Sequence, residues 1–317
     1  DFFEFCNSKR LICFFNLGKS FEYFRIYRYL KIIKSVNILV LNLGNFGNKT
    51  FIDFKIKFLF KSFYHYYDRS LYYFFRIFTI LNYFPRIDYF FQSDLDVINN
   101  IKKGISNKID NFFDIKKISY YKNIIKVNSK SFDYVKNKRI KSKSKKFIIY
   151  VDIPLDHPDR TTREGNVSLV TKKKFHKNLK NFLIFLSKLL KQKIIICPHP
   201  KQRNTKKIFP NFEIAKKRTI ELIPNASLVI FTESSAMTTA VLLKKKILCI
   251  QSNLMGDYLL NLSNKYINYL NLKKINIDNL DYKKINKNFF NKLYNKNQYD
   301  KFIKNKLNAD GDMKSSG

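Results

Sequence analysis

The chain has 317 residues, which is enough for two domains of ordinary size or for one large α/β domain. Hydrophobic residues make up 45% of it and aromatic residues 16%, so a disordered chain is excluded and real hydrophobic cores are expected. The formal net charge is +37. This charge leaves three interpretations: a nucleic-acid binder, a protein that works at an anionic membrane surface, or a lysine-rich surface set by codon bias.

The excess charge is spread along the whole chain and is mostly lysine, beside abundant Asn, Ile, Phe and Tyr. Such a mixture is typical of an AT-rich genome and favours codon bias. Phosphate-rich or membrane-surface partners stay open, because positive potential concentrates polyanions. Nucleic acid ranks third as a partner, since the sequence has no arginine-rich arm, zinc-finger spacing or aromatic RNA-binding signature.

Cysteine usage and hydropathy bear on the compartment. The four cysteines, none in a C-x-x-C pair, are Cys6, Cys13, Cys197 and Cys249. The last two lie in apolar runs, where a reduced cysteine behaves as a small hydrophobe, and a reducing cytoplasm therefore fits best. The apolar stretch 71–84 is interrupted by Arg76 and is too short to span a bilayer. We expect a cytoplasmic protein, with a peripheral position on the inner membrane as the alternative.

The first part of the chain is rich in aromatic residues and irregular in pattern. Helices are expected at residues 21–33, 51–84 and 94–103, and strands at 37–43 and 87–92. Glycine is scarce there, which suggests a short or truncated domain. This part is interpreted as an N-terminal α/β domain on the acceptor side, over residues 1–135.

A charged run, KNKRIKSKSKK at residues 136–146, has the composition of a linker between domains. After it, apolar runs of strand length alternate with helical patterns. Strands are expected at residues 147–153, 193–197, 228–231, 246–251 and 266–270, and helices at 168–192, 219–225, 235–244, 257–265 and 282–307. This spacing predicts a parallel sheet with right-handed crossovers over residues 147–308, followed by a disordered tail at 309–317.

Polar clusters follow three of these strands, where ligands bind in open parallel sheets. The first is Thr232, Glu233, Ser234 and Ser235, at the start of an expected helix. Free N–H groups and the helix dipole favour an anion there, and capping of the helix by the serine hydroxyls is the alternative. Glu233 opposes an anion unless its side chain points away, toward a ribose hydroxyl.

The second cluster is His199, Pro200 and Lys201, after the strand at 193–197. Proline stops the strand, the histidine can donate a hydrogen bond to a phosphate or nucleotide, and the lysine adds a point charge. A surface turn is the alternative. Together with the serine pair, this cluster indicates a nucleoside mono- or diphosphate.

The third cluster is DIPLDHPDR at residues 152–160, directly after the strand at 147–153. Two prolines stiffen this loop, and Asp156 or His157 can act as a general base toward an acceptor hydroxyl. A rigid turn built on ordinary Asp and Pro turn chemistry is the alternative. The acidic residues show no recognisable metal-ligand set.

The order of these motifs resembles bacterial sialyltransferases and polysialyltransferases of the GT-B fold. It is also similar to a wider group of surface-polysaccharide biosynthesis proteins, in which a D-x-P-x-x-H-P-D loop opens the C-terminal domain. The matching segments are VDIPLDHPDR at 151–160, CPHPK at 197–201, TIELIPNASLVIFTESSA at 219–236 and AVLLKKKILCI at 240–250.

The resemblance implies an α/β, GT-B-like fold: two Rossmann-like domains whose parallel sheets face a cleft, with the donor held mainly by the C-terminal one. In this family the histidine and the serines contact the nucleotide and its phosphate, which assigns these roles to His199, Ser234 and Ser235. The family's acidic catalytic motif, two acidic residues before a glycine, is not visible here. Asp156 and His157 are therefore proposed as the base by position alone.

The expected activity is that of a metal-independent glycosyltransferase without a cofactor. It would move a sugar from a nucleotide-sugar donor, CMP-linked among the candidates, to a bacterial surface glycan or lipid-linked acceptor. Two alternatives remain. One is a polyol-phosphate transferase or nucleotide-sugar epimerase of similar fold, and the other is a non-catalytic basic binding protein.

Overall fold

The structure is a computed structural model. It describes residues 12–14, 28, 36–40, 78, 83, 87–102, 121–142, 147–156, 160–161, 164–200, 202 and 204–308. By contacts the chain divides into two compact units, one built mainly from residues up to Ser129 and the other from Lys130–Leu307. A linker at residues 136–146 between two independently folding domains stays a prediction, as does a disordered tail at 309–317.

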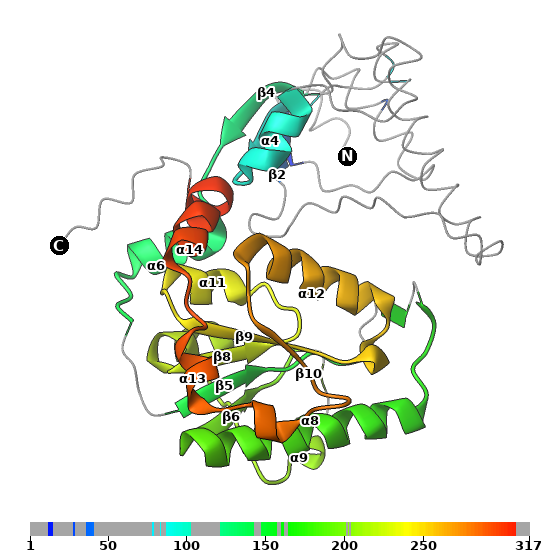
Figure 1. The fold of residues 1–317 in the computed structure, drawn as a ribbon. Coiled ribbons are helices and arrows are strands. Elements are labelled where there is room, and N and C mark those ends of the chain that lie inside the picture. The colour runs from blue at the N-terminus through cyan, green and yellow to red at the C-terminus, as the bar shows by residue number, and fades with distance from the viewer. Residues whose placement is uncertain are drawn as a thin grey trace. The chain divides into compact units, whose positions relative to one another are not determined.

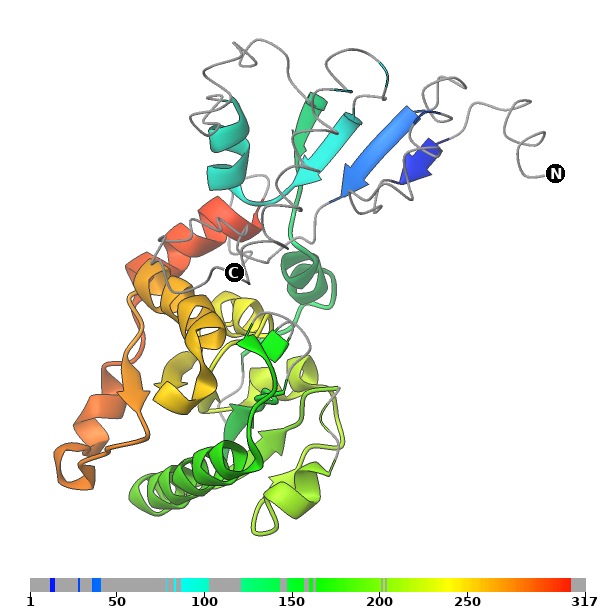
Figure 2. The same cartoon turned by 90° about the vertical axis from the view of Figure 1, so that its right-hand side faces the viewer.

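The first unit contains a parallel sheet in the order β1-β2-β3-β4 (Figure 2). Its strands are β1 (Ile12–Phe14), β2 (Val36–Val40), β3 (Ile87–Gln92) and β4 (Tyr121–Lys126), and α4 (Leu95–Lys102) follows β3. The expected strands near residues 37 and 87 are thereby confirmed, whereas β1 and β4 were not anticipated. The expected helices at 21–33 and 51–84 lie almost entirely outside the described residues.

The second unit begins with α6 (Lys130–Asn137) and contains a six-stranded sheet, all parallel, in the order β10-β9-β8-β5-β6-β7. The strands are β5 (Phe147–Val151), β6 (Lys193–Cys197), β7 (Glu213–Ile214), β8 (Leu228–Phe231), β9 (Lys246–Gln251) and β10 (Lys274–Asn276). The chain starts at β5, builds outward to β7, and then returns to β8 on the other side of β5. The strand order therefore reverses between β5 and β8, and this is the topological switch point of the sheet.

Helices cover both faces of this second sheet (Figure 1). The long helix α8 (Leu169–Leu190) lies on one face, and α11 (Met237–Leu242) and α12 (Asp257–Leu270) lie on the other. Shorter helical segments are α9 (Thr205–Ile208), α10 (Thr219–Leu222), η3 (Ile223–Asn225), η4 (Asn253–Met255), η5 (Tyr282–Lys284), α13 (Lys287–Asn291), α14 (Lys296–Phe302) and the π-helical η6 (Ile303–Leu307). The expected α/β class, with Rossmann-like parallel sheets, is confirmed.

The core explains why α8 forms where the sequence predicted it. Ser168 caps its first turn, since the Ser168 hydroxyl accepts the Thr171 N–H, and Lys191 ends it in a left-handed conformation with φ 51°. Apolar residues at helical spacing, Phe175, Leu179, Phe182, Leu183 and Leu186, are fully buried. They pack against one face of the strands, which include Ile148, Ile196 and Ile230.

Two expected elements differ from the structure. The segment 266–270 is not a strand but the last turn of α12, because Tyr266, Ile267 and Leu270 continue the buried stripe of that helix; the strand β10 follows at Lys274. The expected helix at 282–307 is divided into four short segments. Asparagine side chains start two of them, since Asn286 accepts the Phe289 N–H and Asn295 accepts the Gln298 N–H.

Candidate functional site

The polar motifs lie at one edge of the second sheet. Because β6, β5 and β8 are parallel neighbours, their carboxyl ends meet at the same edge. His199 follows β6, Asp152 follows β5 and Thr232 follows β8. The strands that precede the histidine and the serine pair are not neighbours, because β5 lies between them. The two motifs are thus separated by two strand spacings, about 10 Å.

The serine segment forms a turn before a short helix. The helix α11 begins at Met237, not at Ser235 as expected, and has six residues. The Ser234 hydroxyl accepts the Ala236 N–H at 3.2 Å, and the Ser235 carbonyl accepts the Thr238 hydroxyl at 2.7 Å. Ser234 is half-buried and Ser235 is exposed. The Ser234 hydroxyl thus stabilises the turn before α11, whose N-cap Ala236 has no side-chain cap, and the Ser235 side chain lies at the surface.

The histidine segment turns directly after β6. His199 is half-buried, and its carbonyl accepts the Gln202 N–H at 2.8 Å. Pro200 is exposed, whereas Lys201 lies outside the described residues. Glu233, after β8, is half-buried. The structure thus places the His199 turn at the edge where a nucleotide phosphate was expected, without showing a phosphate contact.

The proposed base Asp156 is exposed and forms an ion pair. Lys172 Nζ lies 3.0 Å from Asp156 Oδ2. Partial burial acts to raise the pKa of the Asp156 carboxyl, but the hydrogen bond and charge of Lys172 outweigh it and hold this pKa below its usual range. A carboxylate with a lowered pKa is a weaker proton acceptor. The other proposed base, His157, lies outside the described residues.

A second carboxyl, Asp152, lies in the middle of the edge and was not among the predicted site residues. Asp152 is 2% exposed, and neither of its carboxyl oxygens has a hydrogen-bond partner of normal geometry. Burial raises its pKa to about 7, against a smaller opposing effect of the nearby Tyr150 hydroxyl and Ile153 N–H. The signal in the sequence is a single Asp that directly follows the apolar run FIIYV.

Thr232 lies beside Asp152. The last paired residues of the two strands are Val151 and Phe231, and Asp152 and Thr232 come next on each strand. Thr232 is fully buried, and its hydroxyl has no hydrogen-bond partner. Its carbonyl accepts the Cys249 thiol at 3.5 Å. Two buried polar side chains without partners therefore lie next to each other at the switch point.

Arg160 and Glu164, in the segment that follows β5, contact the start of α12. Arg160 Nε donates to the Met255 carbonyl at 2.9 Å and lies 3.3 Å from Glu164 Oε2. The Glu164 carboxylate also accepts the Tyr258 N–H in the first turn of α12. These contacts join residues that follow β5 to residues that follow β9, and β8 lies between these two strands in the sheet.

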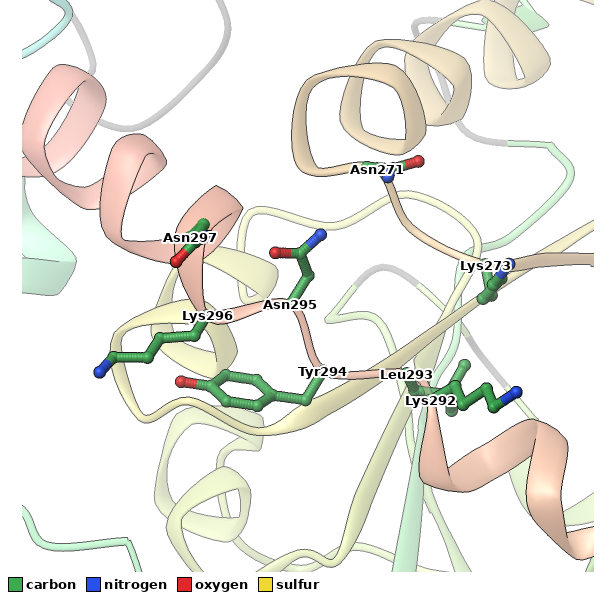
Figure 3. Close-up of a pocket in the computed structure, with 8 residues that line it drawn as sticks. All are labelled: Asn271, Lys273, Lys292, Leu293, Tyr294, Asn295, Lys296 and Asn297. Atoms are coloured by element: carbon green, nitrogen blue, oxygen red, sulfur yellow. The ribbon is translucent and has the colours of Figure 1, made fainter.

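A separate hollow of about 300 Å³ lies next to the amino end of β10 (Figure 3). Its lining includes Lys273, Lys292 and Lys296, but the side chains of Lys292 and Lys296 point in opposite directions (Figure 3). The lysines do not converge on one position, and the hollow is at the edge of the sheet opposite the candidate site.

No group of three or more His, Cys, Asp or Glu side chains among the described residues is placed to hold a metal ion. No helix in the described ranges is long and apolar enough to cross a membrane.

Comparison with known proteins gives similarity in fold alone. No protein-family model and no curated protein matches the sequence. The solved structures similar to it include the calicheamicin glycosyltransferase CalG4, with 7% identity over 80% of this chain and 58% of that one and a TM-score of 0.39. A protein from Listeria monocytogenes described as a UDP-N-acetylglucosamine 2-epimerase has 10% identity over 97% and 73% of the two chains, with a TM-score of 0.44. The glycotransferase of kitacinnamycin has 7% identity over 82% and 62%, with a TM-score of 0.34.

Proposed function

We propose that the second unit binds a nucleotide at the carboxyl ends of β6, β5 and β8, and that the protein is a glycosyltransferase. The donor would be a nucleotide sugar, CMP-linked among the candidates, and the acceptor a bacterial surface glycan or lipid-linked glycan. The observation that carries this proposal is the position of the polar motifs. All three follow the central strands at the switch point of a parallel sheet, where open α/β sheets bind their ligands.

The proposed reaction is a substitution at the anomeric carbon of the donor sugar. The acceptor hydroxyl oxygen bonds to that carbon, the bond from carbon to phosphate oxygen breaks, and the nucleotide leaves with the electron pair. Negative charge then increases on the phosphate, where hydrogen bonds from His199 and Lys201 would stabilise it. The acceptor proton passes to a base in the β5 loop. His157 and Asp156 are the proposed groups, and the ion pair of Asp156 with Lys172 favours His157.

Ligand-induced stabilisation tests the nucleotide step. Apparent stability would be measured with CMP, CDP, UDP and GDP and with their sugars, because a ligand that binds only the folded state raises the unfolding temperature. We expect one nucleotide family to raise it, and we expect the matching nucleotide sugar to lose its sugar to an added glycan acceptor. An isomerised nucleotide sugar formed without acceptor would identify an epimerase instead. Failure of every nucleotide to bind would refute the proposal.

A further inference from the structure

Asp152 and Thr232 form a pair of buried polar side chains for which the described part of the chain offers no hydrogen-bond partner of normal geometry. Asp152 is 2% exposed and Thr232 is fully buried. Among the described residues, both carboxyl oxygens of Asp152 and the hydroxyl of Thr232 lack a hydrogen bond of normal geometry, and the Tyr150 hydroxyl beside Asp152 lacks one as well. The great majority of buried polar side chains in proteins have such partners. Two exceptions at adjacent positions therefore require an explanation.

Their location indicates a ligand. The pair follows β5 and β8, the two strands between which the strand order reverses. It also lies between the His199 turn after β6 and the Ser234 turn after β8. Any nucleotide that contacts both turns must pass over Asp152 and Thr232, because β5 occupies the middle position.

The chemistry of the pair selects the part of the ligand that it can bind. Within the described residues, no lysine or arginine forms an ion pair with Asp152. An uncompensated carboxyl repels a phosphate when charged. It accepts hydrogen bonds well from O–H donors, and two adjacent donors can each reach one of its oxygens. The Thr232 hydroxyl can add one bond in either direction.

We propose that Asp152 and Thr232 bind a vicinal pair of hydroxyl groups of the nucleotide-sugar donor, on its ribose or on the transferred sugar. This inference rests on the proposed function and deepens it. The Tyr150 hydroxyl is fully buried and lies near the Asp152 carboxyl. Both groups are out of contact with solvent, so a ligand reaches them only when their surroundings rearrange. The hydroxyl groups then supply the hydrogen bonds that Asp152 and Thr232 lack.

Calorimetric titration of Asp152→Asn and Thr232→Val tests this inference. Both substitutions keep the size of the side chain, and a control, Glu213→Gln, removes an exposed carboxylate at the amino end of β7. The probes are CMP, UMP and GMP, their 2′-deoxy and 3′-deoxy forms, and CMP-, UDP- and GDP-sugars. We expect Asp152→Asn to weaken binding of the nucleotide that the parent selects by about 10-fold or more. The control should bind as the parent does.

The deoxy probes distinguish the two sources of the hydroxyl pair. With a ribose pair, the deoxy forms bind the parent about 10-fold more weakly, and Asp152→Asn adds no further loss. With a pair on the transferred sugar, Asp152→Asn weakens only the nucleotide sugars. If the parent binds a nucleotide and neither substitution changes the affinity for nucleotide or nucleotide sugar, the inference is overturned and the proposed function stands. If the parent binds none of the probes, both proposals fall.

Discussion

The carboxylate of Glu164 lies directly over Gly256. A Cβ atom added to Gly256 would lie 2.0 Å from Glu164 Oε2 and 2.9 Å from Arg160 Nη2. Gly256 has φ 82° and ψ 162°, a conformation that is essentially restricted to glycine. The Glu164 carboxylate accepts the Tyr258 N–H, so the positive end of the α12 dipole is balanced by a carboxylate from the β5 loop. A glycine is required where this loop meets α12.

Replacing Gly256 by Ala should destabilise the fold through both backbone strain and steric overlap. The matched control is Gly165→Ala, because Gly165 has φ 81° but no atom within 4 Å of an added Cβ. We expect the overlap to cost about 1–3 kcal/mol more at Gly256 than at Gly165. Urea unfolding of the two variants and the parent measures this difference. Equal losses in the free energy of unfolding would show that the Glu164 side chain moves aside and that the overlap adds no destabilisation.

Removal of Glu164 should destabilise the protein more than removal of an exposed acidic residue. The side chains of Arg160 and Glu164 are only 10% and 19% exposed, whereas those of Lys193 and Glu213 are 61% and 55% exposed. Glu164→Ala leaves Arg160 partly buried without its partner and opens the first turn of α12, at an expected loss of about 2–3 kcal/mol. Glu213→Ala should cost about 0–1 kcal/mol. Comparable losses in urea unfolding would show that the Glu164 contacts contribute nothing beyond a surface pair.

Hydrophobic periodicity made much of the second sheet predictable. Apolar runs such as IIIC and LVIF lie between polar residues and became buried strands. The two-residue strand β7 is too short to give a periodic signal, and Tyr266 to Leu270 reads equally well as strand or helix. Only packing decided between them, because these residues continue the buried stripe of α12.

The candidate site was less predictable than the strands, because the local sequence pattern does not determine the order of strands in a sheet. Along the chain, only the short β7 lies between β6, which precedes His199, and β8, which precedes Ser234. In the sheet, however, β5 lies between β6 and β8. Asp152 was passed over for the same reason: the importance of its position depends on β5 being central. Whether the serines and His199 contact a nucleotide stays a prediction.

The double change of Ser234 and Ser235 to Ala separates a nucleotide contact from a helix cap. Alanine is a good helix former, and loss of the Ser234 hydroxyl removes its bond to the Ala236 N–H in the turn before α11, at about 0.5–1.5 kcal/mol of stability. If the serines also contact a phosphate, nucleotide affinity should fall about 10-fold or more, at about 1.5–3 kcal/mol for each bond to a charged group. Titration calorimetry with the nucleotide that the parent binds measures this. Unchanged nucleotide affinity with reduced stability would show that the serines have only a structural role at the start of α11.

Relative to Asp152→Asn, the parent should lose stability as the pH rises from about 4 to 7. Burial lowers the pKa of His176 to about 4, which acts in the opposite direction from about pH 4 to 6.5, but it does so in both proteins. Burial raises the pKa of the Asp152 carboxyl from 3.8 to about 7. In that interval the folded protein keeps a proton that the unfolded chain has released, so the free energy of unfolding decreases with pH and then levels off above 7. The full difference corresponds to about 4 kcal/mol. The side chain in Asp152→Asn cannot ionise, so this variant should lack the decrease. Its free energy of unfolding should therefore increase relative to that of the parent as the pH rises.

Urea unfolding of the parent and Asp152→Asn at pH 4.5, 6.0 and 7.5 measures the effect. The series stops there because burial lowers the pKa of Lys245 to about 8, so that this second group changes protonation at higher pH. Ligand hydroxyl groups that donate to Asp152 favour its charged form and lower its pKa again. Nucleotide affinity should therefore increase between pH 6 and 8 in the parent relative to Asp152→Asn, because titration of the ligand phosphate is common to both proteins. Parallel stability curves for the two proteins would mean that the carboxyl is not held in its neutral form by burial, and the pH dependence of binding would then be lost as well.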